Sequence, residues 1–316
     1  MKHLLGVKDL SPKIIKDILK EAFYFKQLVE KKDPRLKKLL ADQVVANVFF
    51  EPSTRTRISF EIAAKKLGAT VINALEGATS LDKGETVFDT LLNLEAMGVD
   101  LFIIRHSESG MPHYLSRYLK TPIINAGAGA HEHPTQALLD LMTIVEHKTK
   151  LQGLKLVIVG DILHSRVARS NIFCLSKLGV RVTLCTFPTL IPKGFSELDL
   201  EISYNLQEAI RDADVIMVLR LQKERHQQND IPSIKEYIKY FQLNTSLKFP
   251  PKALIMHPGP VNRNVEMSDE LYNHSQSVVL SQVRNGLPMR MALISIFLQN
   301  KFLTQKNDRK SKRGKA

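Results

Sequence analysis

The chain has 316 residues, of which 44% are hydrophobic and 24% charged. These values are typical of globular proteins and exclude collagen-like, low-complexity and wholly disordered chains, and the length suffices for two domains of about 150 residues each. The net charge of +13 indicates an anionic partner, which could be a nucleic acid, a membrane surface or a phosphorylated metabolite.

Short apolar runs alternate with helical patterns along the chain. Ser11-Pro12 opens the first helix, with a hydroxyl at the N-cap and proline at the first helical position. The pattern then predicts strands at 43–50, 70–75, 100–106 and 122–126, and helices at 53–67, 85–98 and 134–148. After a polar break at 148–154, it predicts strands at 154–160, 180–185, 214–218 and 253–257, and helices at 166–178, near 206–211 and near 287–299.

Two successive β/α series of similar length predict an α/β fold with two parallel-sheet domains and the active site in the cleft between them. We expect a first domain at 1–147 and a second at 148–303, with the terminal helix near 287–299 packing back on the first domain. Residues 301–316 hold seven Lys or Arg and one Asp, so we expect 304–316 to form a disordered basic tail.

Two cysteines, Cys174 and Cys185, are too few for a disulfide framework, and both have apolar neighbours. We therefore expect buried free thiols in a reducing compartment. The longest apolar run is far shorter than the roughly 18 residues that cross a bilayer, and the N-terminus lacks a signal-peptide core. The sequence thus predicts a cytoplasmic protein without a membrane partner.

The segment FFEPSTRTRISFE (49–61) offers an anion site. Ser53 to Arg57 follow a strand and occupy the first turn of a helix, where free N–H groups and positive partial charge favour phosphate. Two hydroxyls and a guanidinium in that turn would add charge-assisted hydrogen bonds. Taken alone, the same letters also fit a serine N-cap followed by solvated arginines.

Other polar residues follow strand ends. Arg105 ends a strand, where open α/β sheets bind ligands, although such an arginine often forms a surface ion pair. His133 stands at a helix entrance, where a neutral imidazole could donate to a carbonyl oxygen, and His131 is its competitor. Gly160 opens a strand–helix turn without G-x-G-x-x-G, which disfavours a dinucleotide-dependent dehydrogenase. Absent tryptophan and 7% aromatics disfavour nucleic-acid binding.

The order and spacing of eight motifs over about residues 5–300 resemble the aspartate/ornithine carbamoyltransferase family. The motifs are STRTR (53–57), SLDKGET (80–86), IIRH (103–106), HEHPTQALLD (131–140), GDILHSRVARSN (160–171), VLRLQKER (218–225), HPGPVNR (257–263) and NGLPMRMAL (285–293). The resemblance implies transfer of a carbamoyl group from carbamoyl phosphate to an amino acid, with no cofactor and no metal. It also implies that the first domain binds carbamoyl phosphate and the second binds the amino acid.

The resemblance assigns roles to individual residues. For carbamoyl phosphate it implies Ser53, Thr54, Arg55, Thr56, Ser80, Lys83, Arg105, His133, Gln136, Gly259 and Pro260. For aspartate it implies Lys83, Arg166, Arg220 and Gln222. The catalytic set would be Arg55, Thr56, Lys83, Arg105 and His133, with His133 selected over His131 because it immediately precedes Pro-Thr-Gln. Arg169 remains a structural residue.

The second substrate follows from local chemistry. An ornithine enzyme would be expected to show Lys at the position of Glu51 and a Cys in the turn at 257–260, and neither is present. Lys83, Arg166 and Arg220 suit a dicarboxylate and would repel a terminal ammonium. We therefore expect aspartate, in a step of pyrimidine biosynthesis, with ornithine or another amino acid as the alternative.

The resemblance also implies an oligomer. In the family the SLDKGET loop reaches the neighbouring subunit's site, so Ser80 and Lys83 would complete a shared site in a homotrimer. It leaves room for a regulatory or dihydroorotase-like partner. Two positions depart from the usual pattern: Ala128 stands where Asp is common and Asn264 where Gly is frequent. We expect these departures to alter loop packing rather than activity.

Overall fold

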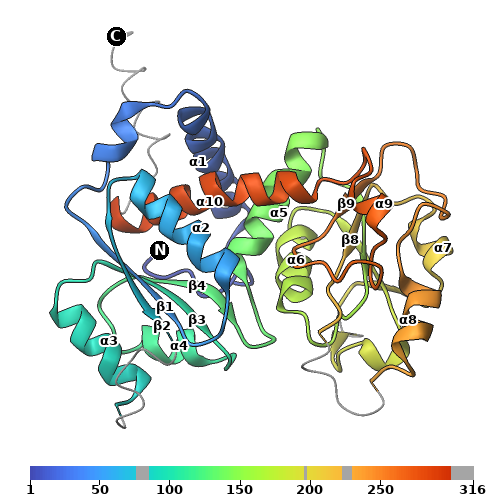
Figure 1. The fold of residues 1–316 in the computed structure, drawn as a ribbon, viewed down its shortest axis with the longest axis horizontal. Helices are drawn as coiled ribbons and strands as arrows, with labels where there is room; N and C mark the ends of the chain where they lie inside the picture. The colour runs from blue at the N-terminus through green and yellow to red at the C-terminus, as the bar shows by residue number, and fades with distance from the viewer. Residues whose placement is uncertain (76–84, 196–197, 223–229, 300–316) are drawn as a thin grey trace. The chain divides into compact units, whose positions relative to one another are not determined.

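The computed structural model describes residues 1–75, 85–195, 198–222 and 230–299 (Figure 1). Its contacts divide the chain into two compact units: Met1–Leu138 together with the segment that begins at Arg284, and Leu139–Val283. The two boundaries fall inside the helices α5 (Pro134–His147) and α10 (Val279–Gln299). Each unit is built around its own parallel sheet.

The first unit holds a four-stranded parallel sheet in the order β2-β1-β3-β4. Its elements are α1 (Pro12–Glu30), η1 (Pro34–Lys38), β1 (Val44–Phe49), α2 (Thr54–Lys66), β2 (Thr70–Leu75), α3 (Val87–Ala96), β3 (Leu101–His106), α4 (Met111–Ser116) and β4 (Ile123–Ala128). From β1 the chain passes to β2 on one side and then to β3 on the other. The topological switch point, where open α/β sheets bind ligands, therefore lies between β1 and β3.

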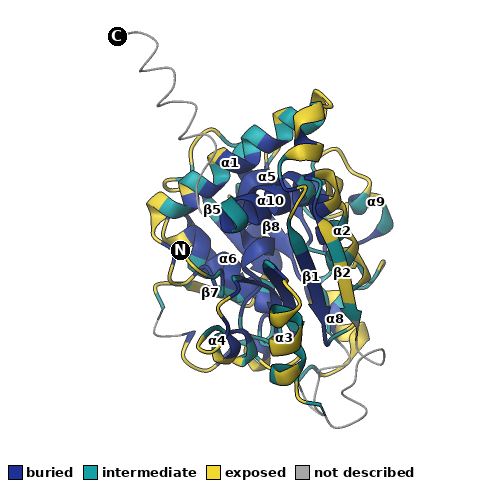
Figure 2. Cartoon of the chain, turned by 90° about the vertical axis from the view of Figure 1, so that its left-hand side faces the viewer, coloured by how far each residue is buried: buried dark blue, intermediate teal, exposed yellow. Residues whose placement is uncertain are grey.

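Strands β1 and β2 differ in burial. Strand β1 is buried over its last five residues. Its Val48 packs, together with Ile104 of the neighbouring strand β3, against Leu91 of α3 and Leu115 of α4. Strand β2 lies at the edge of the sheet and carries exposed side chains (Figure 2). This edge leaves one row of backbone groups without a neighbouring strand of the described sheet.

The second unit holds a five-stranded parallel sheet in the order β7-β6-β5-β8-β9. Its elements are β5 (Lys155–Val159), α6 (Arg166–Ser176), β6 (Arg181–Cys185), η3 (Pro188–Leu190), β7 (Glu201–Ser203), α7 (Leu206–Ile210), β8 (Val215–Val218), α8 (Ile234–Phe241), β9 (Leu254–Met256) and α9 (Asp269–Tyr272). One core cluster joins Val157, Ile216 and Ile255 of the sheet to Tyr237 and Phe241 of α8. Here the switch point lies between β5 and β8.

These sheets confirm the predicted fold class of two parallel-sheet α/β domains, and each predicted strand is present. The start of the last helix was wrong: α10 begins at Val279 instead of near residue 287. Gly286 and Pro288 are weak helix formers, but the helix continues through them because its following residues, such as Met289 and Leu293, are fully buried. The short strand β7 and the helices α4, α8 and α9 were not predicted.

Both cysteines are free and buried, as the sequence predicted. Burial raises the pKa of the Cys185 thiol to about 12, so this group is not a nucleophile at neutral pH. Across the part of the chain that the structure describes, no helix combines the length and the apolar character needed to cross a bilayer. The predicted basic tail, 304–316, lies outside the described residues.

Candidate active site

The first turn of α2 is open to a ligand. Ser53 occupies the N-cap position, but its side chain makes no capping hydrogen bond. The N-cap side chains of six other helices do cap, namely Ser11, Thr86, Ser165, Asn205, Ser233 and Ser268. At α2 the backbone N–H groups and the Ser53 hydroxyl therefore face a site where an anion can replace the missing cap.

The two arginines of this turn differ. Arg55 is exposed, whereas Arg57 Nη1 lies 3.5 Å from Glu61 Oε2, four residues later on the same helix. Glu61 also accepts a hydrogen bond from Lys65 Nζ at 2.7 Å. Arg57 therefore belongs to an ion-pair row along α2, and Arg55 is the guanidinium at the helix start that suits a ligand.

Arg105 lies across the switch point from this turn. Its strand β3 pairs with β1, where Phe49 is the partner of Arg105, and Phe50 N donates to Arg105 O at 2.9 Å. Arg105 Nη2 lies 3.0 Å from Glu51 Oε1, and its side chain is only 11% exposed. The ion pair fixes a largely buried guanidinium beside the residues that lead into α2, a position that suits recognition of phosphate or a carbonyl oxygen.

His133 and Gln136 stand at the start of α5, and both are buried. The loop before them is tied to the sheet, because Gly129 N donates to His106 O at 3.0 Å and Ala128 N donates to Glu132 O at 3.1 Å. Both residues thus follow β4, next to β3 in the same sheet. The structure brings the described first-unit candidates to one edge of this sheet.

His131, the competitor of His133, has a different surrounding. Its ring stacks on His113 of α4 with centroids 6.1 Å apart and planes inclined by 11°. Burial first, and the charge of His131 second, lower the pKa of His113. The structure therefore places His131 in a histidine pair with α4, and the selection of His133 as the substrate-binding histidine stays a prediction.

Acid is expected to destabilise the fold through its histidines. Burial and Lys2 lower the pKa of His3 from 6.5 to about 4, and the pKa of His113 is lowered as well. The unfolded chain therefore takes up protons below pH 6.5 that the folded chain resists, so stability is complete above 6.5 and falls as the pH drops toward 4. Because His3 is only half-buried, solvent screening limits its share to roughly 1 kcal/mol.

Melting temperatures between pH 7.5 and 5 measure this loss. The variant His3→Gln should melt with a shallower pH dependence, whereas His147→Gln, at an exposed position, should match the wild type. Equal slopes for His3→Gln and the wild type would contradict the assignment.

In the second unit, Arg166 begins α6, seven residues after the end of β5, and is 8% exposed. Ser165 caps this helix, accepting from Ala168 N at 3.1 Å. Arg169 lies elsewhere: its Cζ is 5.2 Å from the centre of the Phe195 ring, and burial lowers the pKa of its guanidinium. The structure thus separates Arg166, at the strand end, from Arg169, which packs on an aromatic ring.

The loop after β8 meets the loop after β5. Asp161, fully buried, accepts from Gln222 N at 3.1 Å and lies 2.9 Å from His164 Nδ1. Gln222 Nε2 donates to His164 O at 2.9 Å. Arg220 stands in the same loop, so Arg166, Arg220 and Gln222 gather at the second switch point. In this arrangement the amide nitrogen of Gln222 serves to join the two loops.

The turn after β9 completes this edge of the second sheet. Gly259 has φ +64°, and its peptide bond to Pro260 is cis. Gly259 N donates to His257 Nδ1 at 2.8 Å, and Asn262 Nδ2 donates to Leu221 O at 3.2 Å in the loop after β8. The first bond holds the turn internally, and the second fixes the segment after Gly259–Pro260 to the loop that carries Arg220.

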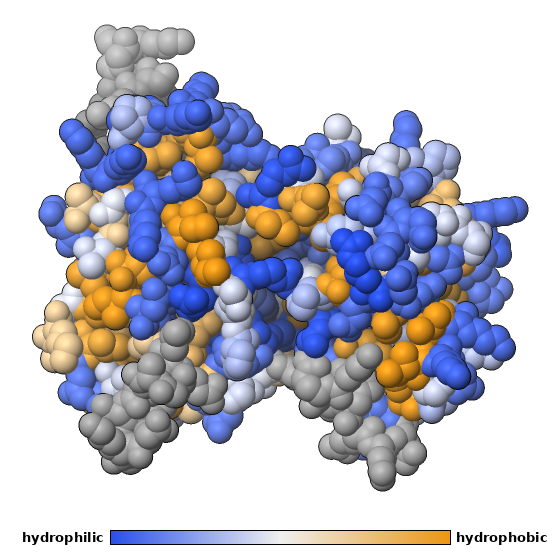
Figure 3. Space-filling view, in the orientation of Figure 1, coloured by the Kyte–Doolittle hydropathy of each residue, from blue (hydrophilic) through white to orange (hydrophobic). Residues whose placement is uncertain are grey.

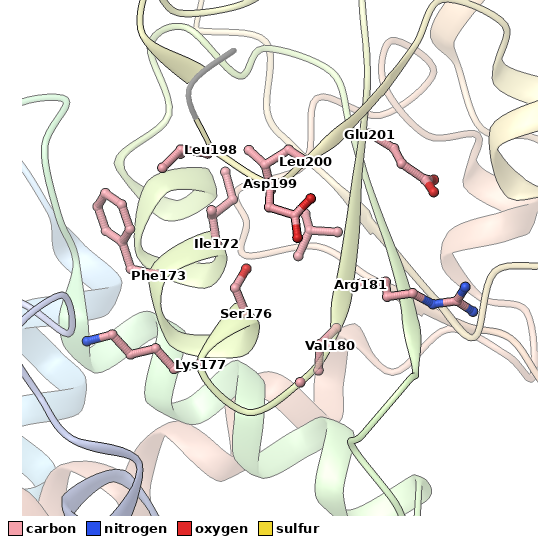
Figure 4. Close-up of a pocket in the computed structure, with 12 residues that line it drawn as sticks. Ile172, Phe173, Ser176, Lys177, Val180, Arg181, Leu198, Asp199, Leu200 and Glu201 are labelled. Carbon is pink, nitrogen blue, oxygen red and sulfur yellow. The ribbon is translucent and has the colours of Figure 1, made fainter.

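A cavity of about 470 Å³ lies apart from these residues (Figure 4). Its walls come from the end of α6, the start of β6 and the segment before β7: Ile172, Phe173, Ser176, Lys177, Gly179, Val180, Arg181, Val182, Leu198, Asp199, Leu200 and Glu201. None of the candidate site residues lines it. It opens near the amino ends of the strands, the opposite edge from the switch point, so the ligand-binding assignment rests on the strand-end residues instead.

Known proteins match both units. One domain of the family described as aspartate/ornithine carbamoyltransferase, its carbamoyl-P binding domain, matches residues 2–146, and its Asp/Orn binding domain matches residues 152–297. The chain belongs to the aspartate/ornithine carbamoyltransferase family. The predicted resemblance is confirmed, and the chain is an enzyme of a transferase family.

Individual relatives refine this placement. The aspartate carbamoyltransferase catalytic subunit of Syntrophus aciditrophicus is 52% identical over 93% of this chain and 96% of its own length. The Trypanosoma cruzi aspartate transcarbamoylase in complex with carbamoyl phosphate and aspartate is 28% identical, with a TM-score of 0.86 over 93% and 96% of the two chains. The ornithine carbamoyltransferase of Pyrococcus furiosus is 30% identical, with a TM-score of 0.84 over 95% and 98%. The fold alone therefore does not select the amino acid.

Two family-motif departures have local explanations. Asn264 adopts a left-handed conformation with φ +61°, which glycine and asparagine tolerate best. Its side chain also bonds Asp269, accepting from Asp269 N at 3.2 Å. Ala128 ends β4 and is buried.

Ser80 and Lys83, which the resemblance assigns to the site, lie outside the described residues.

Sequence reasoning missed residues that orient the site. It did not predict that Glu51 would pair with Arg105, or that Asp161 and His164 would join the loops of the second unit. A polar residue directly after a buried strand was the available signal for all three. Their partners could not be read from the sequence, because they lie up to 61 residues away along the chain.

Proposed function

We propose that this chain transfers the carbamoyl group of carbamoyl phosphate to the amine of L-aspartate, giving N-carbamoyl-L-aspartate and phosphate in pyrimidine biosynthesis. The observation that carries the proposal is the uncapped start of α2, with the hydroxyls of Ser53, Thr54 and Thr56 and with Arg55, beside the largely buried Arg105. This arrangement suits the phosphate group of an acyl phosphate, and the 52% identity to an aspartate carbamoyltransferase catalytic subunit supports aspartate.

The first-unit residues would bind carbamoyl phosphate. Ser53, Thr54, Arg55 and Thr56 would donate to the phosphate with the first N–H groups of α2. Arg105 and His133, with Thr56, would polarise the carbonyl and stabilise the oxyanion that forms when the amine attacks. Gln136 and the carbonyls of the Gly259–Pro260 turn would accept from the carbamoyl amide and fix its orientation.

The second-unit residues would bind the amino acid. Arg166 and Arg220 would each hold a carboxylate of aspartate, and Gln222 would complete this subsite. The amine would then face the carbonyl carbon. As its nitrogen forms the new C–N bond, the C–O bond to phosphate breaks, and the departing phosphate can accept the proton that the amine loses. Catalysis would come from positioning and charge stabilisation, without an acylated side chain.

A paired assay tests the proposal directly. The purified protein is incubated with carbamoyl phosphate and either aspartate or ornithine, and carbamoyl-aspartate and citrulline are quantified. Carbamoyl-aspartate alone is expected. Citrulline as the main product would replace the proposal by the ornithine alternative, and no product from either amino acid would overturn it.

We further propose a cytoplasmic homotrimer in which Ser80 and Lys83 complete the neighbour's site. Two features support it. Ile58 and Ile62 of α2 are 40% and 43% exposed, and Ile72 of edge strand β2 is 37% exposed, so both elements expose apolar side chains (Figure 3). The SLDKGET segment follows β2 directly in the chain. An exposed apolar face with an unpaired strand edge is typical of a subunit interface.

Mixing two inactive variants tests the shared site. Arg55→Ala and Lys83→Ala chains, unfolded together and reassembled, should regain activity because some sites then receive Arg55 from one chain and Lys83 from another. Native mass spectrometry on the same sample should show trimers with mixed composition. Mixed trimers without recovered activity would contradict the shared site. A larger particle from the native source would indicate a regulatory or dihydroorotase-like partner.

A further inference from the structure

A fully buried carboxylate, Asp140, lies in α5 of the second unit and has no part in the mechanism above. Buried carboxylates are rare unless they are paired. Asp140 Oδ2 accepts from Asn171 Nδ2 at 2.9 Å, and Asp140 Oδ1 accepts from Gln282 Nε2 at 2.8 Å. The two amides come from α6 and α10, so one carboxylate joins three helices.

Gln282 extends this contact to the turn after β9. Its Oε1 accepts from His257 N at 2.9 Å, and His257 Nδ1 accepts from Gly259 N at 2.8 Å. His257 is 1% exposed and Gln282 is 3% exposed, so water does not compete for these bonds. A continuous chain of hydrogen bonds therefore runs from Asp140 to the Gly259–Pro260 turn, buried as far as His257 and half-buried at Gly259.

Asn171 extends the contact to the aspartate subsite. It is fully buried and lies five residues after Arg166 on α6. Its Nδ2 also donates to Val167 O at 3.1 Å, which binds the side chain to the first turn of that helix. Asp140 is thus joined, through one amide on each branch, to the turn after β9 and to the start of α6.

The chemistry of a carboxylate fits this position. An ionised carboxylate only accepts hydrogen bonds, so both amides must turn their nitrogen atoms toward it. Gln282 then has to present its oxygen to His257 N. An asparagine at position 140 would set one of its own N–H groups against an amide donor and remove this constraint.

We propose that Asp140 is a positioning residue that holds Arg166 and the Gly259–Pro260 turn in register through Asn171 and Gln282. The proposal rests on the proposed function, since it concerns the two substrate-binding segments of the second unit. It adds a residue that touches neither substrate. Small displacements of such segments lower turnover strongly, because the reacting atoms must lie within about 3.5 Å of each other.

A donor–acceptor exchange tests the role of Asp140. Asp140→Asn places an N–H group of the new amide against the amide donor of Asn171 or Gln282, and Asn171→Asp places two carboxylates against each other. Each single variant should therefore lose about 10- to 100-fold in kcat/KM for aspartate, with a raised KM. In the double variant the amide introduced at position 140 would donate to the carboxylate introduced at position 171 and still accept from Gln282. The double variant should recover to within about threefold of the wild type, allowing for the lost bond to Val167.

Thr143→Val is the matched control. Thr143 is fully buried in the same helix, and its hydroxyl donates to Leu139 O at 2.9 Å within α5. This variant should lower the melting temperature without raising KM, because partial unfolding reduces the number of active sites and leaves their affinity unchanged. A raised KM in Thr143→Val would show that removing any buried polar group of α5 raises KM, and would overturn the specific role of Asp140.

Three further outcomes separate the proposals. A folded Asp140→Asn protein with wild-type kcat and KM would overturn the positioning role while the proposed function stands. A double variant as impaired as the single variants would also overturn it. If the wild type forms no carbamoyl-aspartate, the proposed function fails, and the positioning role that rests on it is overturned with it.

Discussion

Replacing Arg55 by alanine is expected to lower kcat about 10²- to 10³-fold, the usual loss when one preorganised donor to a developing negative charge is removed. Arg55 is exposed on the first turn of α2 and contributes nothing to the apolar core, so the melting temperature should stay close to that of the wild type. The measurement is steady-state turnover with both substrates saturating, together with thermal unfolding of the same preparation.

Arg57→Ala is the control for this experiment. It removes the same charge two residues later on the same helix, but its guanidinium is engaged with Glu61. An i,i+4 ion pair along a helix contributes only about 0.3–0.5 kcal/mol, so this variant should be slightly less stable and nearly fully active. Equal losses of turnover in the two variants would show that net positive charge, and not the position of Arg55, matters.

Much of the candidate site could be predicted because its residues follow strand ends. In a parallel sheet the carboxyl ends of all strands lie at one edge, so Ser53, Arg105 and His133 are brought together by three separate strand predictions. The same holds for Arg166, Arg220 and Gly259 in the second sheet. Each position required only the end of a buried apolar run and the short loop after it, since all of these residues lie within seven residues of the ends of their strands.

The positions that could not be predicted depend on contacts across the fold. Nothing in the sequence shows that Ser53 leaves its helix uncapped while Ser165 caps its own, because both stand before helices in similar patterns. Asp140 and Gln282 are separated by 142 residues along the chain, and only the structure shows that they are bonded. The start of α10 was predicted too late for a different reason. The low helix propensity of Pro288 favours a later start, but the burial of the residues that follow keeps the segment helical.

The net charge of +13 can now be interpreted by position. In the first unit Arg55 and Arg105 stand at the switch point between β1 and β3, and in the second unit Arg166 and Arg220 stand at the one between β5 and β8. Two pairs of guanidiniums at ligand-binding edges suit two small anions, one phosphorylated and one dicarboxylate. Much of the remaining excess lies in residues 301–316, which contribute +6.

Arg166→Ala is expected to raise the KM for aspartate about 100-fold or more, because removing one partner of a buried charge-assisted contact costs about 2–5 kcal/mol. The KM for carbamoyl phosphate should change little, since Arg166 is not among the residues proposed to bind that substrate. The KM of Arg166→Lys for aspartate should fall between those of the wild type and Arg166→Ala, because lysine keeps the charge but loses the bidentate geometry that suits a carboxylate. Initial rates over a grid of both substrate concentrations give the two KM values separately.

Arg181→Ala supplies the matched charge removal in the same unit. Arg181 is exposed at the start of β6 and lines the cavity at the opposite edge of the sheet. Its loss changes the net charge by the same amount and should leave both KM values unchanged. Because Arg166 is largely buried, thermal unfolding of Arg166→Ala has to accompany the kinetics. A folded Arg166→Ala protein with an unchanged KM for aspartate would remove Arg166 from the aspartate subsite and leave Arg220 as the remaining described guanidinium proposed for it.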